Sequence, residues 1–200
     1  MKKFRTNKEI SQIFSINLAK WKRWSREFLP PDPLGGLQSG YARQYNLDEA
    51  FTVYLCGHLV GDLKFTIPEA KQILSDLHQW LVDHDFYFDF SGSASPAKNE
   101  TAQPVQNYQI AIISTNVPAG SLTGLRYRSK AIISSDSTEF NGVPMQQERF
   151  IESWVSAPDN EAAAPDVASY RVLNISVLRQ TFLGYFDSGM TLNQIHPAIP

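Results

Sequence analysis

The sequence predicts an α+β fold, in which a helical N-terminal part is followed by a smaller α+β part with a mostly antiparallel sheet. Apolar residues recur at helical spacing through residues 1–82, and several later segments alternate apolar and polar residues as strands do. The charge changes as well, because residues 1–45 carry nine Lys and Arg against three acids, whereas residues 81–200 carry seven against twelve. We therefore expect two domains, residues 1–82 and residues 83–200.

The composition is that of an ordinary soluble globular protein, with 42% hydrophobic and 19% charged residues in 200. No run of about 18 apolar residues is present, so no membrane-spanning helix is expected. The basic N-terminus is not followed by an apolar segment, so we do not expect a secretory signal. Cys56 is the only cysteine, which excludes an internal disulfide or a multi-cysteine zinc site and favours the cytoplasm.

Four helices are expected in the first domain, and three of them follow a capping box. Each capping box pairs a short polar residue with a glutamate three positions later: Thr6 with Glu9, Asn46 with Glu49, and Thr66 with Glu69. Apolar spacing places the helices at about residues 10–14, 17–28, 47–60 and 67–82. Asn17 is suited to cap the second helix, and Pro30 and Pro31 stop it.

The second domain is expected to contain strands, two loops and one late helix. Phe86, Phe88 and Phe90 alternate with polar residues, which predicts a half-buried strand over residues 85–90. Further strands are expected at residues 108–113, 125–133 and 149–155, loops at 91–106 and 157–168, and a helix at 175–186. The aromatic residues of the first strand and of the late helix would form the core of this domain or an interface.

Residues 4–82 resemble the winged helix–turn–helix domain of the MerR-type family. Three segments carry the resemblance: the helical segment from Ile16 to Trp24, the end of that helix at Leu29-Pro30-Pro31, and the Ser39-Gly40-Tyr41-Ala42-Arg43-Gln44-Tyr45 segment in the place of the wing. The resemblance implies that helix 17–28 reads the major groove of double-stranded DNA and that a wing at residues 38–45 contacts the backbone.

The candidate DNA-binding residues lie on this helix and wing. Asn17, Lys20 and Arg23 follow at i, i+3 and i+6 and share one face, from which Asn can contact adenine and Arg can contact guanine. Lys22 and Arg26 flank that face and could hold phosphates, and the wing would place Tyr41 and Arg43 on the backbone. Trp21 and Trp24 continue the apolar stripe, so they are expected in the core rather than against bases.

These observations predict a sequence-specific DNA-binding protein that regulates transcription. Helical periodicity ends near residues 82–85, so the long dimerisation helix of the MerR family is not expected, and residues 83–200 would form a homodimer or sense a ligand instead. An architectural DNA-binding protein such as an excisionase, or an adaptor that holds other proteins, is the alternative.

No enzymatic activity, metal or cofactor is expected. The sequence has no phosphate-binding loop, dinucleotide-binding glycine motif or Cys-x-x-Cys pair. His78, Asp83, His84 and Asp85 lie at a predicted helix end and match no compact zinc pattern. Cys56 and His58 are two residues apart on a helix and do not face each other, so Cys56 is expected to be a small buried side chain. An enzyme in the C-terminal half stays open as an alternative, because that half matches no known pattern.

Overall fold

The computed structural model describes residues 4–32, 42–88, 107–115, 124–155 and 167–188. It confirms the α+β class, with five helices and two antiparallel sheets in the described residues. The chain forms two compact units, which are residues 1–93 with 178–200, and residues 94–177. We expected a single boundary after residue 82, but the C-terminal helix from Leu178 onward belongs to the same unit as the N-terminal helices.

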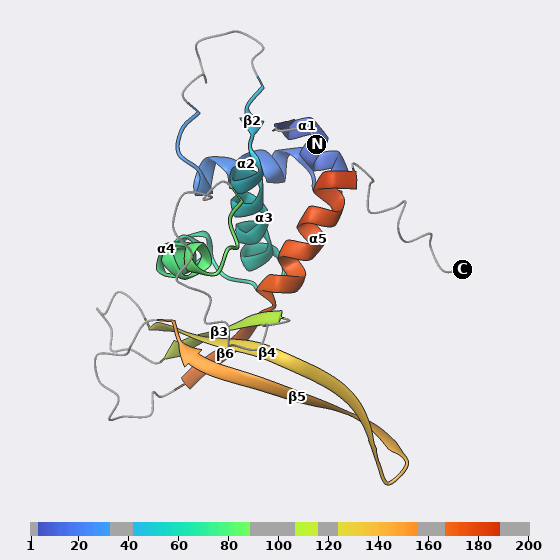
Figure 1. Cartoon of the computed structure of the whole chain (residues 1–200). Helices are drawn as coiled ribbons and strands as arrows, with labels where there is room; N and C mark the ends of the chain where they lie inside the picture. Colours follow the sequence, from blue (N-terminus) through green and yellow to red (C-terminus); the bar gives the residue numbers. More distant parts are fainter. Residues whose placement is uncertain (1–3, 33–41, 89–106, 116–123, 156–166, 189–200) are drawn as a thin grey trace. The chain divides into compact units, whose positions relative to one another are not determined.

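The first unit contains the four predicted helices and a small two-stranded sheet (Figure 1). Its elements in chain order are β1 (Arg5–Thr6), α1 (Asn7–Ile13), α2 (Leu18–Phe28), β2 (Gln44–Tyr45), α3 (Leu47–Gly61) and α4 (Ile67–Asp83). All three predicted capping boxes are formed. β1 pairs with β2 in antiparallel register, with Arg5 opposite Tyr45, and so ties the N-terminus to the segment before α3.

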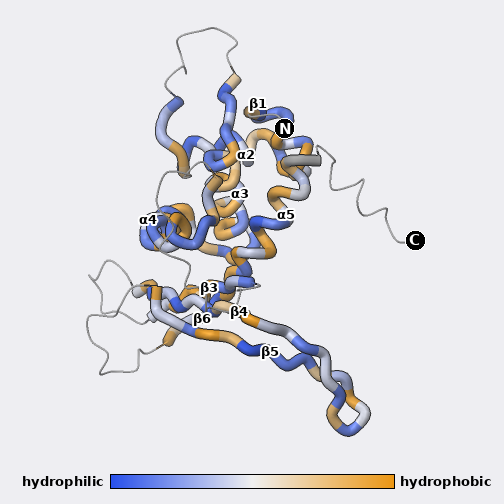
Figure 2. The backbone as a smooth tube through the Cα atoms, viewed as in Figure 1, coloured by the Kyte–Doolittle hydropathy of each residue, from blue (hydrophilic) through white to orange (hydrophobic). Residues whose placement is uncertain are grey.

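Helix α3 is the centre of the first unit. Its side chains are buried on several sides, as expected for a helix that is apolar nearly all round, and Figure 2 shows mainly hydrophobic residues along it. Cys56 is fully buried among them, as predicted. Burial raises the pKa of the Cys56 thiol, so this cysteine is a packing residue rather than a nucleophile.

Helix α5 (Ile175–Ser188) completes the core of the first unit from the C-terminal end of the chain. The ring of Phe182 is fully buried and lies 5.3 Å from the rings of both Phe14 and Phe51. Arg179 donates a hydrogen bond of 3.1 Å to the carbonyl of Phe86. These aromatic residues therefore belong to the N-terminal core and not to a separate second core.

The predicted strand over residues 85–90 is wrong for its described part. Residues 86–88 form no strand, and the amide of Phe88 donates to Oδ1 of Asp48 at 2.7 Å. Phe86 is buried and stacks on Trp80 at 5.6 Å. The alternation therefore reflects a bent segment whose aromatic side chains pack on helices, whereas residues 89–90 lie outside the described part.

The second unit contains a four-stranded antiparallel sheet. Its strands are β3 (Asn107–Thr115), β4 (Leu125–Phe140), β5 (Val143–Trp154) and β6 (Val167–Leu173), in the order β5-β4-β3-β6. Three of them overlap the strands predicted from the sequence, although β5 ends one residue before the predicted strand 149–155 does, and β6 overlaps the end of a predicted loop. β4 and β5 continue past the other two strands as a long hairpin (Figure 1).

Candidate nucleic-acid interface

Helix α2 is anchored by the side that faces α3. Trp21 is fully buried and Trp24 is 6% exposed, so both tryptophans are core residues, as predicted. Gly57 of α3 allows the close approach of Trp24, because a Cβ at this position would lie 2.4 Å from the indole ring. The helix that carries most of the predicted DNA-binding residues is therefore fixed against a rigid neighbour.

The connection between α1 and α2 is four residues long and closed by side-chain hydrogen bonds. Oγ of Ser11 donates to the carbonyl of Ile16 at 2.7 Å. Oδ1 of Asn17 accepts from the amides of Ala19 and Lys20 at 2.9 and 3.3 Å. Asn17 is therefore the predicted N-cap of α2. Its contact with adenine stays a prediction, and it would compete with capping because both use Oδ1.

The solvent-facing side of α2 is basic. Lys20, Lys22, Arg23 and Arg26 are all exposed. The only acid of this helix is Glu27, whose carboxylate accepts a hydrogen bond of 2.9 Å from Lys71 on α4. That hydrogen bond and the charge of Lys71 lower the pKa of Glu27, with smaller contributions from the two arginines. Glu27 is therefore ion-paired with Lys71 at the side of α2 that lies next to α4, and the exposed centre of α2 carries only positive charges.

Helical geometry separates the basic residues of α2 into a central row and two flanks. Ala19, Arg23 and Arg26 follow at i, i+4 and i+7, and this row lies opposite the buried Trp21. Lys20 lies on the flank toward α3, and its ammonium is 4.7 Å from the centre of the Trp24 ring. Arg23 is therefore the predicted base-contacting residue that projects most directly from the protein.

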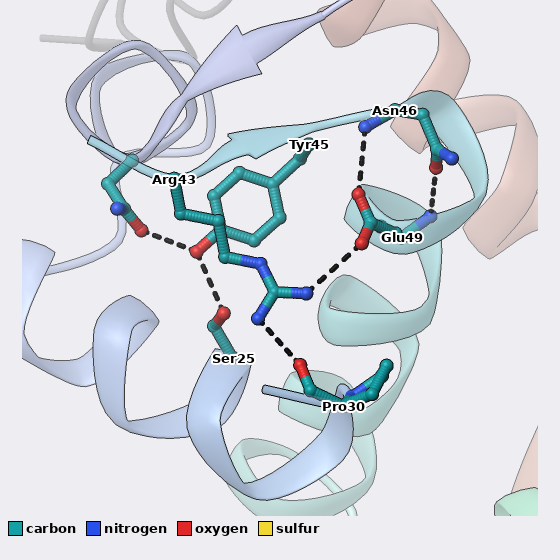
Figure 3. A network of polar contacts seen from close by, with 7 residues as sticks. Ser25, Pro30, Arg43, Tyr45, Asn46 and Glu49 are labelled. Carbon is teal, nitrogen blue, oxygen red and sulfur yellow. Dashed lines mark hydrogen bonds and ion pairs between the residues drawn. The ribbon is translucent and has the colours of Figure 1, made fainter. Parts of the chain in front are cut away.

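A polar network holds the C-terminal end of the predicted wing, residues 43–45 (Figure 3). Arg43 donates to the carbonyl of Pro30 at 2.9 Å and to Oε1 of Glu49 at 3.0 Å. The Tyr45 hydroxyl lies 2.7 Å from Oγ of the buried Ser25 and 2.6 Å from Oδ1 of Asn7. Burial raises the pKa of Tyr45, so this hydroxyl stays protonated and can donate. The network ties β2 to the C-terminal half of α2.

Three of the predicted residues meet at a surface pocket of about 400 Å³ beside α2. Lys22, Arg26 and Arg43 line it, together with Asn7, Ser25, Leu29, Pro30, Pro31, Asp32 and Tyr45. Arg43 is mostly buried, with 14% of its side chain exposed, so its guanidinium forms part of the wall. The pocket therefore presents cationic groups from both α2 and the chain just before β2.

The remaining predicted residues are distributed differently. Tyr41 and the first residues of the expected wing lie outside the described part of the chain, and Lys20 lines a separate pocket of about 220 Å³ with His58 and Asp62. Asn7 and Tyr45 were not among the predicted site residues. The serine at position 25, on the apolar stripe of α2, is the sequence signal that indicates a buried polar partner there.

Comparison with protein-family models gives no match, and comparison with curated proteins gives none either. Within the described ranges, no cluster of three or more His, Cys, Asp or Glu side chains could hold a metal ion. No helix in these ranges is both long and apolar enough to cross a membrane. The exposed basic side of α2 is therefore the feature of this chain that bears most directly on its function.

Proposed function

We propose that the protein binds double-stranded DNA with sequence preference through the exposed face of α2 and acts as a transcriptional regulator in the cytoplasm. The observation that carries the proposal is the basic row of α2, which projects from a helix held in place by two buried tryptophans. A rigid helix with arginines on its outer side has the shape and charge that the major groove accepts.

Base reading is assigned to the row that begins at Ala19. Arg23 can donate two hydrogen bonds to O6 and N7 of guanine, which is the commonest specific contact in the major groove. Ala19 precedes it by one helical turn, and its small side chain allows close approach and can contact a thymine methyl group. A Gln at position 23 would shift the preference toward adenine, whereas a Lys would still favour guanine.

Phosphate binding is assigned to the pocket beside α2. Lys22 and Arg26 of α2 and Arg43 from the chain before β2 all line it, so a backbone phosphate would meet cationic groups from two parts of the chain. Arg43 already uses two N–H groups on Pro30 and Glu49. Its main role is therefore to shape and charge the pocket, while Lys22 and Arg26 hold the phosphate.

Selection of bound fragments from a random duplex library tests the proposal. The wild-type chain should enrich one motif, Arg23→Ala should lose preference at one base position, and Lys130→Ala should behave as wild type, since Lys130 lies in the second unit and pairs with Glu148. Binding that bends DNA without enriching a motif would favour the architectural alternative. An absence of binding at low salt would contradict both DNA-binding functions and favour the adaptor.

A further inference from the structure

The hairpin of β4 and β5 extends beyond the rest of the described sheet. Within the described residues, β3 pairs with β4 only as far as Ile132, which lies opposite Phe150, so residues 133–149 form a two-stranded arm that closes at Asn141 and Gly142. Both turn residues have positive φ, 50° and 79°, as the tight two-residue hairpin turns require. Every residue from 135 to 153 is exposed. A two-stranded ribbon with so little cover is marginally stable alone.

One side of the hairpin carries large exposed apolar residues. In the observed register, Phe140 lies opposite Val143, Asp136 opposite Gln147, and Ala131 opposite Ile151, and all these residues share one side, which we call the Gln147 face. Phe140, Val143 and Ile151 are 66%, 60% and 59% exposed. Figure 2 shows hydrophobic residues at the closed end of the hairpin.

On the opposite side of the hairpin, charged side chains near its base form ion pairs within the chain. Lys130 pairs with Glu148 at 2.6 Å and lies over the Phe150 ring, 4.2 Å from its centre. Arg128 pairs with Glu152 at 3.5 Å. The arm itself carries three acids and one arginine, so a nucleic acid is a poor partner for it. In the part of the chain that the structure describes, the Gln147 face is exposed and β5 is an edge strand with no neighbour on its outer side.

We propose that two copies of this chain associate by antiparallel pairing of their β5 edges, with the two-fold axis at Gln147. Val143 and Ile151 each lie four residues from Gln147, so this pairing places Val143 opposite Ile151 of the partner subunit. Since Phe140 flanks Val143 and Ala131 flanks Ile151 in each hairpin, an apolar row crosses all four strands at each end of the interface. The polar Gln147 rows meet in the middle.

Other positions of the two-fold axis along β5 do not place Val143 opposite Ile151 of the partner subunit. Residues that face each other across a sheet share a side, so the axis must pass through a residue of β5. An axis at Glu148 or at Arg149 places like charges directly opposite each other, which is unfavourable. An axis at Met145 or Gln146 leaves Ile151 without an apolar partner. Among the central axes from Met145 to Arg149, the charge and apolar patterns of β5 therefore both favour Gln147, which argues for a second copy as the partner.

The size of this interface indicates how tightly the two copies should bind each other. Residues 143–151 pair over about 30 Å, and strand pairing covers an edge rather than a broad surface. The contact is therefore below the roughly 800 Å² per partner of a stable complex, and we expect a dimer that dissociates on dilution. The proposal does not depend on DNA binding, and its tests are done without DNA.

Cysteine cross-linking tests the register. With the axis at Gln147, the Cα atoms of position 147 in the two copies are about 4.5–5.5 Å apart, within disulfide range. Position 146 faces its own counterpart only diagonally, at about 7–8 Å. Under diamide oxidation, Gln147→Cys should form a covalent dimer at least tenfold faster than the matched Gln146→Cys. The buried Cys56 gives no background. Equal rates, or a faster reaction at position 146, would overturn the proposed register.

Sedimentation velocity over a concentration series tests the dimer itself. The wild-type chain should pass from monomer to dimer as its concentration rises, and Ile151→Lys should raise the dissociation constant at least tenfold. Ser137→Lys, on the opposite side and on β4, should leave it unchanged. A wild-type chain that stays monomeric at the highest concentration, or equal weakening by both substitutions, would overturn the proposal.

Discussion

Trp24 of α2 packs against the bare Cα of Gly57 on α3. A Cβ at position 57 would lie 2.4 Å from Cζ3 and 2.7 Å from Cε3 of the indole ring. Such distances are far below van der Waals contact, so the position of the basic helix depends on the absence of a side chain at residue 57. Gly61, one turn later on the same helix, has no such neighbour, since its Cβ would meet nothing closer than 3.8 Å.

Gly57→Ala should destabilise the first unit by about 1–3 kcal/mol, because the added methyl group must displace Trp24 or the α3 backbone. Gly61→Ala is the matched control, and it should be neutral or stabilise by up to about 1 kcal/mol through helix propensity. Urea unfolding followed by tryptophan fluorescence measures both. Equal effects of the two substitutions would show that α2 does not depend on the close approach at residue 57.

Phe182→Ala should destabilise the N-terminal helices by about 3–5 kcal/mol, although residue 182 lies far from them in sequence. The reason is that the fully buried Phe182 ring contacts Phe14 and Phe51 in the core of the first unit. Hydrogen exchange of α1 and α3 amides should detect the loss. Gln180→Ala, at an exposed position of the same helix, should leave exchange unchanged. Unchanged protection in the Phe182 variant would contradict the division into units.

Arg43→Ala should lower the free energy of unfolding by about 1–3 kcal/mol, because it removes both hydrogen bonds that join Pro30 and Glu49. Arg43→Lys keeps the charge but cannot form the two-pronged contact, so it should recover only part of this loss. Thermal unfolding of both variants measures the effect. If Arg43→Ala keeps full stability and only weakens DNA binding, then Arg43 is a direct DNA contact, as the sequence first indicated.

Tyr54→Phe should make the protein less sensitive to alkaline pH. Burial raises the pKa of Tyr54 to about 12, with smaller contributions from Tyr185 and Asp62. The stabilisation from the protonated hydroxyl is complete below pH 10 and is lost as the pH rises toward 12, because the unfolded chain ionises first. The two pKa units correspond to about 2.7 kcal/mol, and solvent screening at this partly exposed side chain makes the loss smaller than that. Urea midpoints at pH 8 and pH 11 should differ less in the variant than in the wild type.

Local signals predicted the helical part of the fold well. Each capping box needs only two residues at fixed spacing, and all three formed as expected. Periodicity alone was misleading for Phe86 and Phe88, because alternation shows that a segment is half-buried but not which groups its amides bind or whether its backbone is extended. The Phe88 amide bonds to Asp48, 40 residues away, which no local pattern indicates.

The distal half of the β4–β5 hairpin could not be predicted from hydrophobic periodicity, because residues 134–137 are all small or polar and residues 135–137 are exposed. The Asn141-Gly142 pair is the signal that marks its turn. At the candidate interface, the sequence located the basic helix and its buried tryptophans, but it did not separate Arg23, which projects outward, from Arg43, which is held by Glu49. That distinction depends on tertiary contacts.

The salt dependence of DNA affinity tests the central claim most directly. For duplex DNA, the slope of log Kobs against log salt concentration is about −0.9 per phosphate contacted. Fluorescence anisotropy with the selected duplex should give a steep slope for the wild type and for Lys130→Ala, and a slope about two units shallower for the Lys22→Ala, Arg26→Ala double variant. A double variant with the wild-type slope would contradict the assignment of the phosphate site to α2, and a wild-type chain that binds no duplex at low salt would contradict DNA binding altogether.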